Sequence, residues 1–201
     1  MNWIPEYKPT DFGGPVESMQ NRAGKALYKN VTLVWSKPQL LELDEEKIKP
    51  FFEDDRPLLY AIIRNHHKMM RKNLIAYIGL STNPKARFQN HPTAKELAAK
   101  RGATSLSYAY LDTGRSSSRI DTIKGSLEQI EHILIWALWS QHDLRNDRKV
   151  FTLPGMGTKG ADAWRIINDG YRFSGTMPRE IVYPWMLTRL GKDRSKKKLQ
   201  T

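Results

Sequence analysis

The sequence predicts an α+β fold in which helices flank a small central antiparallel or mixed β-sheet. An apolar run over 58–63 and a β-forming run over 74–78 are joined by a basic loop, which predicts a hairpin. Apolar and smaller side chains alternate over 106–111, so a third strand is expected to return to this hairpin. A helix is expected from about 121 or 126 to 142, where apolar residues recur at helical spacing.

The composition favours a folded protein that binds nucleic acid. The chain has 201 residues, of which 39% are hydrophobic, so it can bury a core. We expect an N-terminal arm over 1–56, a compact core over 57–150, and a C-terminal lobe with a basic tail over 151–201. Lysine and arginine number 33 against 21 acidic residues, a net charge of +12. Nucleases, ribosomal proteins and membrane-surface proteins share this excess of positive charge.

Several protein classes are excluded or made unlikely by what the sequence lacks. It contains no cysteine, which excludes disulfides, cysteine-ligated metals and a cysteine nucleophile. The first residues lack the charged start and apolar run of a signal peptide, and the longest apolar run, over 133–139, is too short to span a bilayer. We therefore expect a cytoplasmic protein that does not enter membranes.

Three further elements are expected outside the central region. The residues 31–35 are typical of a short strand, and 40–52 is expected to hold a helix that is broken near Pro50. Another helix is expected over 161–168, ending at Gly170.

The stretch 77–91 combines a strand end, a helix start and side chains that bind phosphate. Gly79 allows a close backbone approach at the strand end, and Asn83, followed by a proline, is a helix cap. The next proline is expected to end this helix at His91. After this proline, Thr93 and Glu96 form a capping-box pattern that predicts a short second helix, with Gly102 as its stop. Arg87 and His91 are four residues apart and are therefore expected to share one helix face.

Glu131 lies within the apolar stripe of the late helix, whereas Glu128 lies to one side of it. An ionised carboxylate in such a place is costly unless it is paired, protonated or bound to a metal. Pairing with Arg87 or with a tyrosine hydroxyl is the alternative to a metal, and Glu128 is the reserve ligand. The stripe consists of Leu127, Leu134, Ile135 and Leu138.

The stretch 77–91 resembles the second signature of the GIY-YIG nucleases. In that family, a Tyr-Ile-Gly strand end is followed by a serine, an arginine and a histidine at fixed distances. All four polar positions match, at Tyr77, Ser81, Arg87 and His91. The first signature, Gly-Ile-Tyr-x-Ile, corresponds to Leu-Leu-Tyr-Ala-Ile over 58–62, where Tyr60 and the second isoleucine match but the glycine and the first isoleucine do not.

The resemblance implies a metal site on the late helix. GIY-YIG nucleases carry a metal-binding glutamate there, typically followed by an apolar pair three and four residues later, and Glu131 with Leu134 and Ile135 fits this pattern. The implied cofactor is Mg²⁺ or Mn²⁺ on Glu131. An asparagine usually follows this glutamate in the family, and Asn146 is the first one available here.

The resemblance also implies roles for the remaining side chains. Arg87 offers the planar, charged fork that suits a phosphate. Tyr60 is the preferred general base, with Tyr77 holding the nucleophilic water or the phosphate and His91 assisting. The sequence leaves the roles of these three residues interchangeable.

The expected function is that of a metal-dependent endonuclease that hydrolyses double-stranded DNA in restriction or phage defence, with a homodimer as a possible assembly. The alternatives are a homing or repair nuclease, a catalytically silent nucleic-acid-binding module, and a ribosome-associated RNA-binding protein. The basic loop over 64–73, the aromatic and cationic lobe over 171–185 and the tail over 192–198 are further candidates for phosphate contact. A solvated loop tip explains the first equally well, and the aromatic residues of a small lobe more often form a core of their own.

Overall fold

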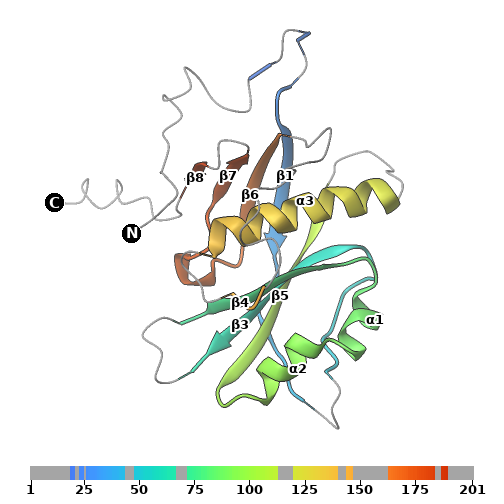
Figure 1. The fold of residues 1–201 in the computed structure, drawn as a ribbon, viewed down its shortest axis with the longest axis vertical. Helices are drawn as coiled ribbons and strands as arrows, with labels where there is room; N and C mark the ends of the chain where they lie inside the picture. The colour runs from blue at the N-terminus through green and yellow to red at the C-terminus, as the bar shows by residue number, and fades with distance from the viewer. Residues whose placement is uncertain are drawn as a thin grey trace, which may run out of the picture.

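The computed structural model describes residues 19–20, 23–24, 26–43, 48–66, 72–112, 120–139, 144–146, 163–183 and 187–189. These residues have the predicted α+β class, with helices packed on a mixed sheet (Figure 1). The strands are β1 (Lys29–Trp35), β2 (Gln39–Leu40), β3 (Leu58–Asn65), β4 (Leu74–Ser81), β5 (Ala103–Asp112), β6 (Trp164–Gly170), β7 (Glu180–Tyr183) and β8 (Leu187–Arg189). The helices are α1 (Pro84–Gln89), α2 (Pro92–Ala99) and α3 (Ile120–Leu138), and η3 (Phe173–Gly175) is a 3-10 turn.

The predicted hairpin and third strand are confirmed. Strands β3 and β4 pair in antiparallel fashion, and β5 pairs antiparallel with the other side of β3. The strands follow the order β4-β3-β5-β1-β6-β7-β8, and β2 adds a short pairing to β5. Strand β4 is therefore at one edge of the described sheet. Within this sheet, only one side of β4 pairs with a strand, β3, so the backbone N–H and C=O groups on its other side can bind other residues.

The two faces of β3 pack against different helices, because successive side chains of a strand point to opposite faces. The side chains directed to the core beneath α3 are Leu59, Ala61 and Ile63. Those directed to the core beneath α1 and α2 are Leu58, Tyr60 and Ile62. Figure 1 shows this arrangement, with α3 on one side of β3 and β4 and the two short helices on the other.

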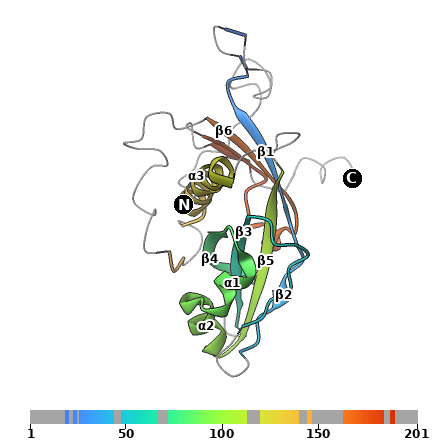
Figure 2. The same ribbon diagram turned by 90° about the vertical axis from the view of Figure 1, so that its right-hand side faces the viewer.

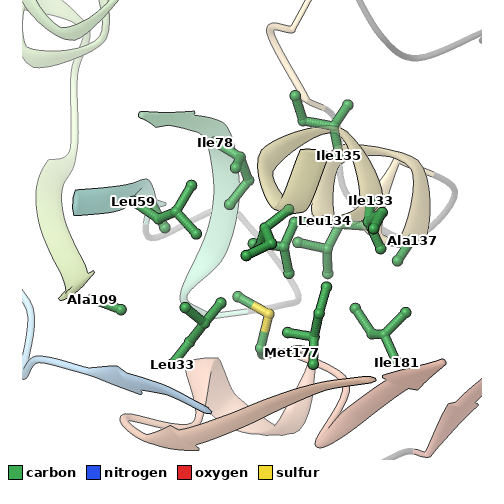
Figure 3. Packing of buried hydrophobic residues seen from close by; sticks show 14 of the residues in the cluster. Leu33, Leu59, Ile78, Ala109, Ile133, Leu134, Ile135, Ala137, Met177 and Ile181 are labelled. Carbon is green, nitrogen blue, oxygen red and sulfur yellow. The ribbon is translucent and has the colours of Figure 1, made fainter. Parts of the chain in front are cut away.

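The larger core lies between α3 and the sheet, and it confirms the predicted apolar stripe of this helix. In Figure 3, the buried α3 side chains face residues from several strands and from the loop before β7, among them Leu33, Leu59, Ile78, Met177 and Ile181. Each fully buried side chain of this size contributes about 1.5–3 kcal/mol. Within the described ranges, neither α3 nor any other helix is long and apolar enough to cross a membrane.

Segments from both ends of the chain join the same sheet. Strand β1 pairs with β6 in parallel over its whole length, and β1 also pairs antiparallel with the end of β5. Figure 2 shows β1 and β6 side by side, with α3 next to them. The expected arm over 1–56 and the lobe over 151–201 therefore share a sheet with the central segment.

Two of the predicted helices are wrong, and the predicted strand over 31–35 is confirmed. In the described parts of 40–52 there is no helix, because Leu40 belongs to β2 and Leu41, Ile48 and Phe52 are buried in the core beneath α1 and α2. The residues 164–170 form β6 instead of the end of a helix, and burial alternates along this strand. Apolar residues with a period of two favour a half-buried strand over a helix.

Candidate active site

The hairpin register places the two signature tyrosines next to each other. Tyr60 pairs with Gly79 across the hairpin, and Ile62 pairs with Tyr77. Tyr60 is fully buried, and its ring is stacked with that of Tyr77 at a centroid distance of 6.1 Å. The ring of Phe88, on α1, meets the Tyr60 ring edge-on at 5.0 Å. The two signatures therefore form one aromatic cluster at the edge of the sheet.

Gly79 makes room for the Tyr60 ring, as its position at the strand end predicts. A Cβ atom at this position would overlap the Cζ and Oη atoms of Tyr60 and would lie 2.8 Å from Cε1 of Tyr77. Any side chain at position 79 would thus displace the hydroxyl groups of both tyrosines.

The predicted helix ending at His91 is wrong in its boundary. Helix α1 begins after the Asn83 cap, as predicted, but it ends at Gln89. The predicted short helix after it is confirmed as α2, which begins at Pro92. His91 is the N-cap of α2, so it does not share a helix face with Arg87. The two side chains still meet at Tyr60, because the turn between the helices directs His91 inward.

His91 makes two hydrogen bonds, and together they define its protonation. The backbone N–H of Ala94 donates to Nδ1 at 3.2 Å, so this nitrogen carries no proton. The proton of a neutral imidazole must then be on Nε2, which lies 2.8 Å from Oη of Tyr60. His91 therefore donates to the Tyr60 hydroxyl while it caps α2.

The electrostatic surroundings keep His91 neutral. It is fully buried. Burial lowers the pKa of His91 to about 4, and the positive charge of Arg87 contributes to this decrease. At neutral pH the tautomer that donates to Tyr60 is therefore the one present.

Arg87 interacts electrostatically with both tyrosines and remains exposed to solvent. Hydrogen bonding to Tyr60 is the main cause that raises the pKa of the Arg87 guanidinium. Burial raises the pKa of Tyr60 well above its ordinary value, and the neighbouring Tyr77 adds to this rise. The hydrogen bond and charge of Arg87 oppose the rise without outweighing it, so Tyr60 is a neutral phenol in the free protein.

Tyr77 is the more accessible of the two tyrosines, being half-buried. Burial raises the pKa of Tyr77, and the negative charge of Glu131 raises it further. Hydrogen bonds with Tyr60 and Arg87 act in the opposite direction. Positive charge brought close to Glu131 would therefore favour ionisation of both phenols, since the Glu131 charge also raises the pKa of Tyr60.

Glu131 approaches this cluster from α3, on the opposite side of β4. It is only 9% exposed, and its neighbours on the helix, Ile130, Leu134 and Ile135, are buried. The reserve ligand Glu128 is exposed. The carboxylate that acts on both phenols is thus the one inside the apolar stripe, which is the position that the sequence predicted for it.

The donor set around Glu131 fits a hard divalent cation that takes most of its ligands from elsewhere. The described residues contain no group of three histidine, aspartate or glutamate side chains arranged to hold a metal. Mg²⁺ is commonly bound by one or two carboxylates together with water and substrate phosphates, so a single buried carboxylate that acts on both tyrosines is sufficient on the protein side. Glu131 is the residue that would hold Mg²⁺ or Mn²⁺.

Asn146 lies on the outer edge of β4, where it binds backbone groups. Its Oδ1 accepts from the backbone N–H of Ile78 at 3.0 Å, and its Nδ2 donates to the carbonyl of the same residue at 2.7 Å. The N–H of Arg145 also donates to the carbonyl of Ala76. Asn146 therefore holds the strand that carries Tyr77, and both of its polar atoms are used for this purpose.

The structure adds to the sequence analysis one site residue and one structural role. Phe88, which packs on Tyr60, was not singled out, although its position directly after Arg87 in an otherwise polar helix is a signal for a buried contact. Arg64, which is predicted to belong to the basic loop, lies in β3, donates to the carbonyls of Leu97 and Arg101, and thereby caps the end of α2. Residues 67–71 of that loop and the tail over 192–198 lie outside the described residues.

Comparisons of the chain with protein-family models, with curated proteins and with solved structures found no match. The function is therefore inferred from the side chains at the edge of β4 and from their motifs.

Proposed function

We propose that the protein is a divalent-metal-dependent DNA endonuclease of the GIY-YIG type, which acts in restriction or in defence against phage. The observation that carries the proposal is the cluster of two tyrosines, Arg87 and His91 at the β3–β4 hairpin. The buried Glu131 of α3 acts electrostatically on both tyrosines. Hydrolysis of a phosphodiester needs an activated water, neutralisation of the phosphate charge and stabilisation of the leaving oxygen, and this group of residues offers a candidate for each.

Arg87 is the candidate for binding the scissile phosphate. Its guanidinium is exposed on the side of the tyrosine hydroxyls, so an incoming phosphate can reach it. A planar fork binds two phosphate oxygens at once, which both neutralises and orients the group. When bound at Glu131, Mg²⁺ or Mn²⁺ would supply further positive charge for the phosphate and the leaving oxygen.

Tyr60 is our preferred base for the attacking water. As a phenolate, it would accept hydrogen bonds from Nε2 of His91 and from Arg87, two donors that are already in place. The His91 proton on Nε2 prevents this nitrogen from taking a proton from Tyr60, so His91 orients the hydroxyl and does not serve as the base. Tyr77 is more exposed and is positioned to hold the water or the phosphate.

A catalytically silent DNA-binding module is less consistent with the buried carboxylate. A negative charge close to a bound phosphate weakens binding, unless a cation lies between them. Glu131 is nearly buried and acts electrostatically on the same tyrosines as Arg87 does, so its presence favours metal-assisted hydrolysis over binding alone. One such site cuts one strand at a time, and two copies of the chain acting together would cut both strands at once.

The proposal is tested by mapping cut ends in modified and unmodified DNAs after incubation with and without Mg²⁺, using the wild-type protein and Arg87→Lys. The lysine keeps the charge but lacks the planar fork, so we expect the turnover at saturating DNA to fall by about 100-fold or more, with little change in affinity.

Lys85→Gln is the matched control, because Lys85 lies on the same helix and is paired with Asp55 on the surface. Its turnover should be close to that of the wild-type protein. Unchanged turnover in Arg87→Lys together with weaker DNA binding would make Arg87 a docking residue, and the absence of metal-dependent cut ends in all DNAs would contradict the nuclease proposal.

A further inference from the structure

We propose that an open pocket at the end of β6 binds a backbone phosphate of the DNA outside the cleavage site. The pocket has a volume of about 460 Å³ and is lined by Ile167, Asn168, Asp169, Arg172 and Arg179. This inference rests on the proposed function in one respect, namely that DNA is the partner. The pocket would be a second contact with DNA. Its residues are far from the tyrosine cluster in sequence and lie in β6 or between β6 and β7.

The two arginines of the pocket are exposed, and in the described part of the chain neither forms an ion pair. Two other described arginines are already engaged. Arg165 is largely buried in a 2.5 Å pair with Glu180, and Arg64 binds backbone carbonyls. With Asp169 as the single carboxylate, the lining has a net charge of +1 and two guanidinium groups available to an anion.

The backbone that carries these arginines is held firmly by Asn168. The Oδ1 atom of Asn168 accepts from Nε1 of Trp35 at 3.0 Å, and its Nδ2 donates to the carbonyl of Pro178 at 2.9 Å. Its N–H also donates to the carbonyl of Arg179 at 2.8 Å. These bonds fix the backbone at Arg179. When its side chain binds a ligand, less conformational entropy is lost than if the backbone also had to become ordered.

Arg172 is anchored in a comparable way by the residue that follows it. The Phe173 side chain is fully buried and meets the ring of Trp35 edge-on at a centroid distance of 5.3 Å. Both arginines thus project from backbone that is attached to the same core tryptophan, directly or through Asn168.

The turn after β6 is also tied to the β3–β4 hairpin, beside which it lies in Figure 1. The Nδ2 atom of Asn73 donates to Oγ of Ser174 at 2.7 Å. Lys72, the neighbour of Asn73, is exposed, so a third cation belongs to this region. Cations that are spread over a wide pocket and an adjoining hairpin suit the successive phosphates of a nucleic-acid strand better than one small anion.

The test measures binding of a fluorescent mixed-sequence DNA duplex to the metal-free protein over a range of salt concentrations. If the pocket holds one phosphate, Arg172→Gln/Arg179→Gln should reduce the slope of log affinity against log salt by about 0.9, and the affinity at 0.1 M salt should fall by roughly 5–10-fold. Both arginines are exposed, so the variant should keep the circular dichroism spectrum of the wild-type protein.

The matched control is Lys37→Gln/Lys49→Gln, which removes the same charge from exposed positions that do not line the pocket. Equal losses in the two double variants would show that only the total charge matters and would overturn the proposal, as would an unchanged slope in the arginine variant. Competition by inorganic phosphate at millimolar concentration, with no loss of duplex binding in the variant, would identify a site for the free anion instead. A slope change specific to the arginines in a protein that cuts no DNA would support the pocket and contradict the nuclease proposal.

Discussion

At the scale of single residues, His91 connects the helix cap to the chemistry of the site. Its Nδ1 accepts from the first turn of α2, and its Nε2 is hydrogen-bonded to the hydroxyl of Tyr60. The cap therefore selects the tautomer that donates to Tyr60 and would stabilise its phenolate. A side chain that served only one of these two partners would leave the other buried group without a hydrogen bond, which costs about 1–3 kcal/mol.

We predict that His91 makes the folded state less stable at acidic pH. The pKa of His91 is lowered to about 4 by burial and by Arg87, whereas the unfolded chain titrates near its ordinary value of 6.5. Between these values the unfolded chain binds the proton more strongly, so the free energy of unfolding should decrease by up to about 3 kcal/mol as the pH falls from 6.5 to 4.

His91→Asn is the appropriate comparison, because asparagine keeps a cap acceptor for α2 but does not titrate in this range. Urea unfolding at several pH values should give a flatter pH dependence for this variant than for the wild-type protein. Parallel curves for the two proteins would show that His91 does not carry the predicted acid sensitivity.

At the scale of secondary structure, the β3–β4 hairpin depends on a glycine opposite Tyr60. We predict that Gly79→Ala lowers the free energy of unfolding by about 1–3 kcal/mol and abolishes cleavage, because its methyl group would overlap the Tyr60 hydroxyl. Gly125→Ala in α3 is the control. A methyl group there meets nothing within 4 Å, so this variant should remain active and gain up to about 1 kcal/mol in stability.

Thermal unfolding and cleavage assays of the two alanine variants check this prediction. Full activity in Gly79→Ala would mean that Tyr60 can move away from the strand without loss of function, which would contradict its role as a precisely held base.

The elements that the sequence predicts correctly are those with strong local patterns. Each of these patterns can be recognised within a short stretch of sequence. They are the apolar run of β3, the alternation of apolar and smaller side chains in β5, and the apolar stripe of α3. The sequence predicts two helices around Pro92 but misplaces the boundary between them. A proline after His91 is compatible both with the end of one helix and with the first turn of the next, so the role of His91 as the N-cap of α2 is not apparent. The sequence predicts that Arg87 and His91 lie together because they share one helix face. In the structure they belong to different helices, and the turn between these helices brings both side chains to Tyr60.

The wrong assignments depend on partners that are distant in the chain. The short strand β2 exists because Gln39 and Leu40 pair with residues of β5. Strand β6 pairs along its length with β1, which precedes it by more than a hundred residues. The hydrogen bond between Tyr60 and His91 is equally remote from local patterns, since spacing predicts a common site but not which atoms meet.

For the molecule as a whole, strands from both ends of the chain are needed to cover the core of the central segment. The buried face of α3 packs not only on β3 and β4 but also against Leu33 from β1, Ile166 from β6 and Ile181 from β7. We predict that a fragment of residues 57–150 does not fold by itself, because it would expose this face to water.

Circular dichroism and amide NMR spectra of the fragment test this prediction, with a chain trimmed to 19–189 as the folded control. A dispersed spectrum and cooperative unfolding of 57–150 would contradict it and would favour an autonomous core with separable additions.

We propose that Glu131 holds the metal with which Tyr60 and Arg87 cut DNA. The most direct measurement compares the metal-dependent, single-turnover cleavage rates of Glu131→Gln and Glu128→Gln at saturating protein. Glu131 is nearly buried and its charge acts on both tyrosines, whereas Glu128 is exposed one turn earlier on the same helix. We predict that Glu131→Gln loses at least about 100-fold in rate while still binding DNA, and that Glu128→Gln cleaves like the wild-type protein. Full activity in Glu131→Gln would contradict the claim.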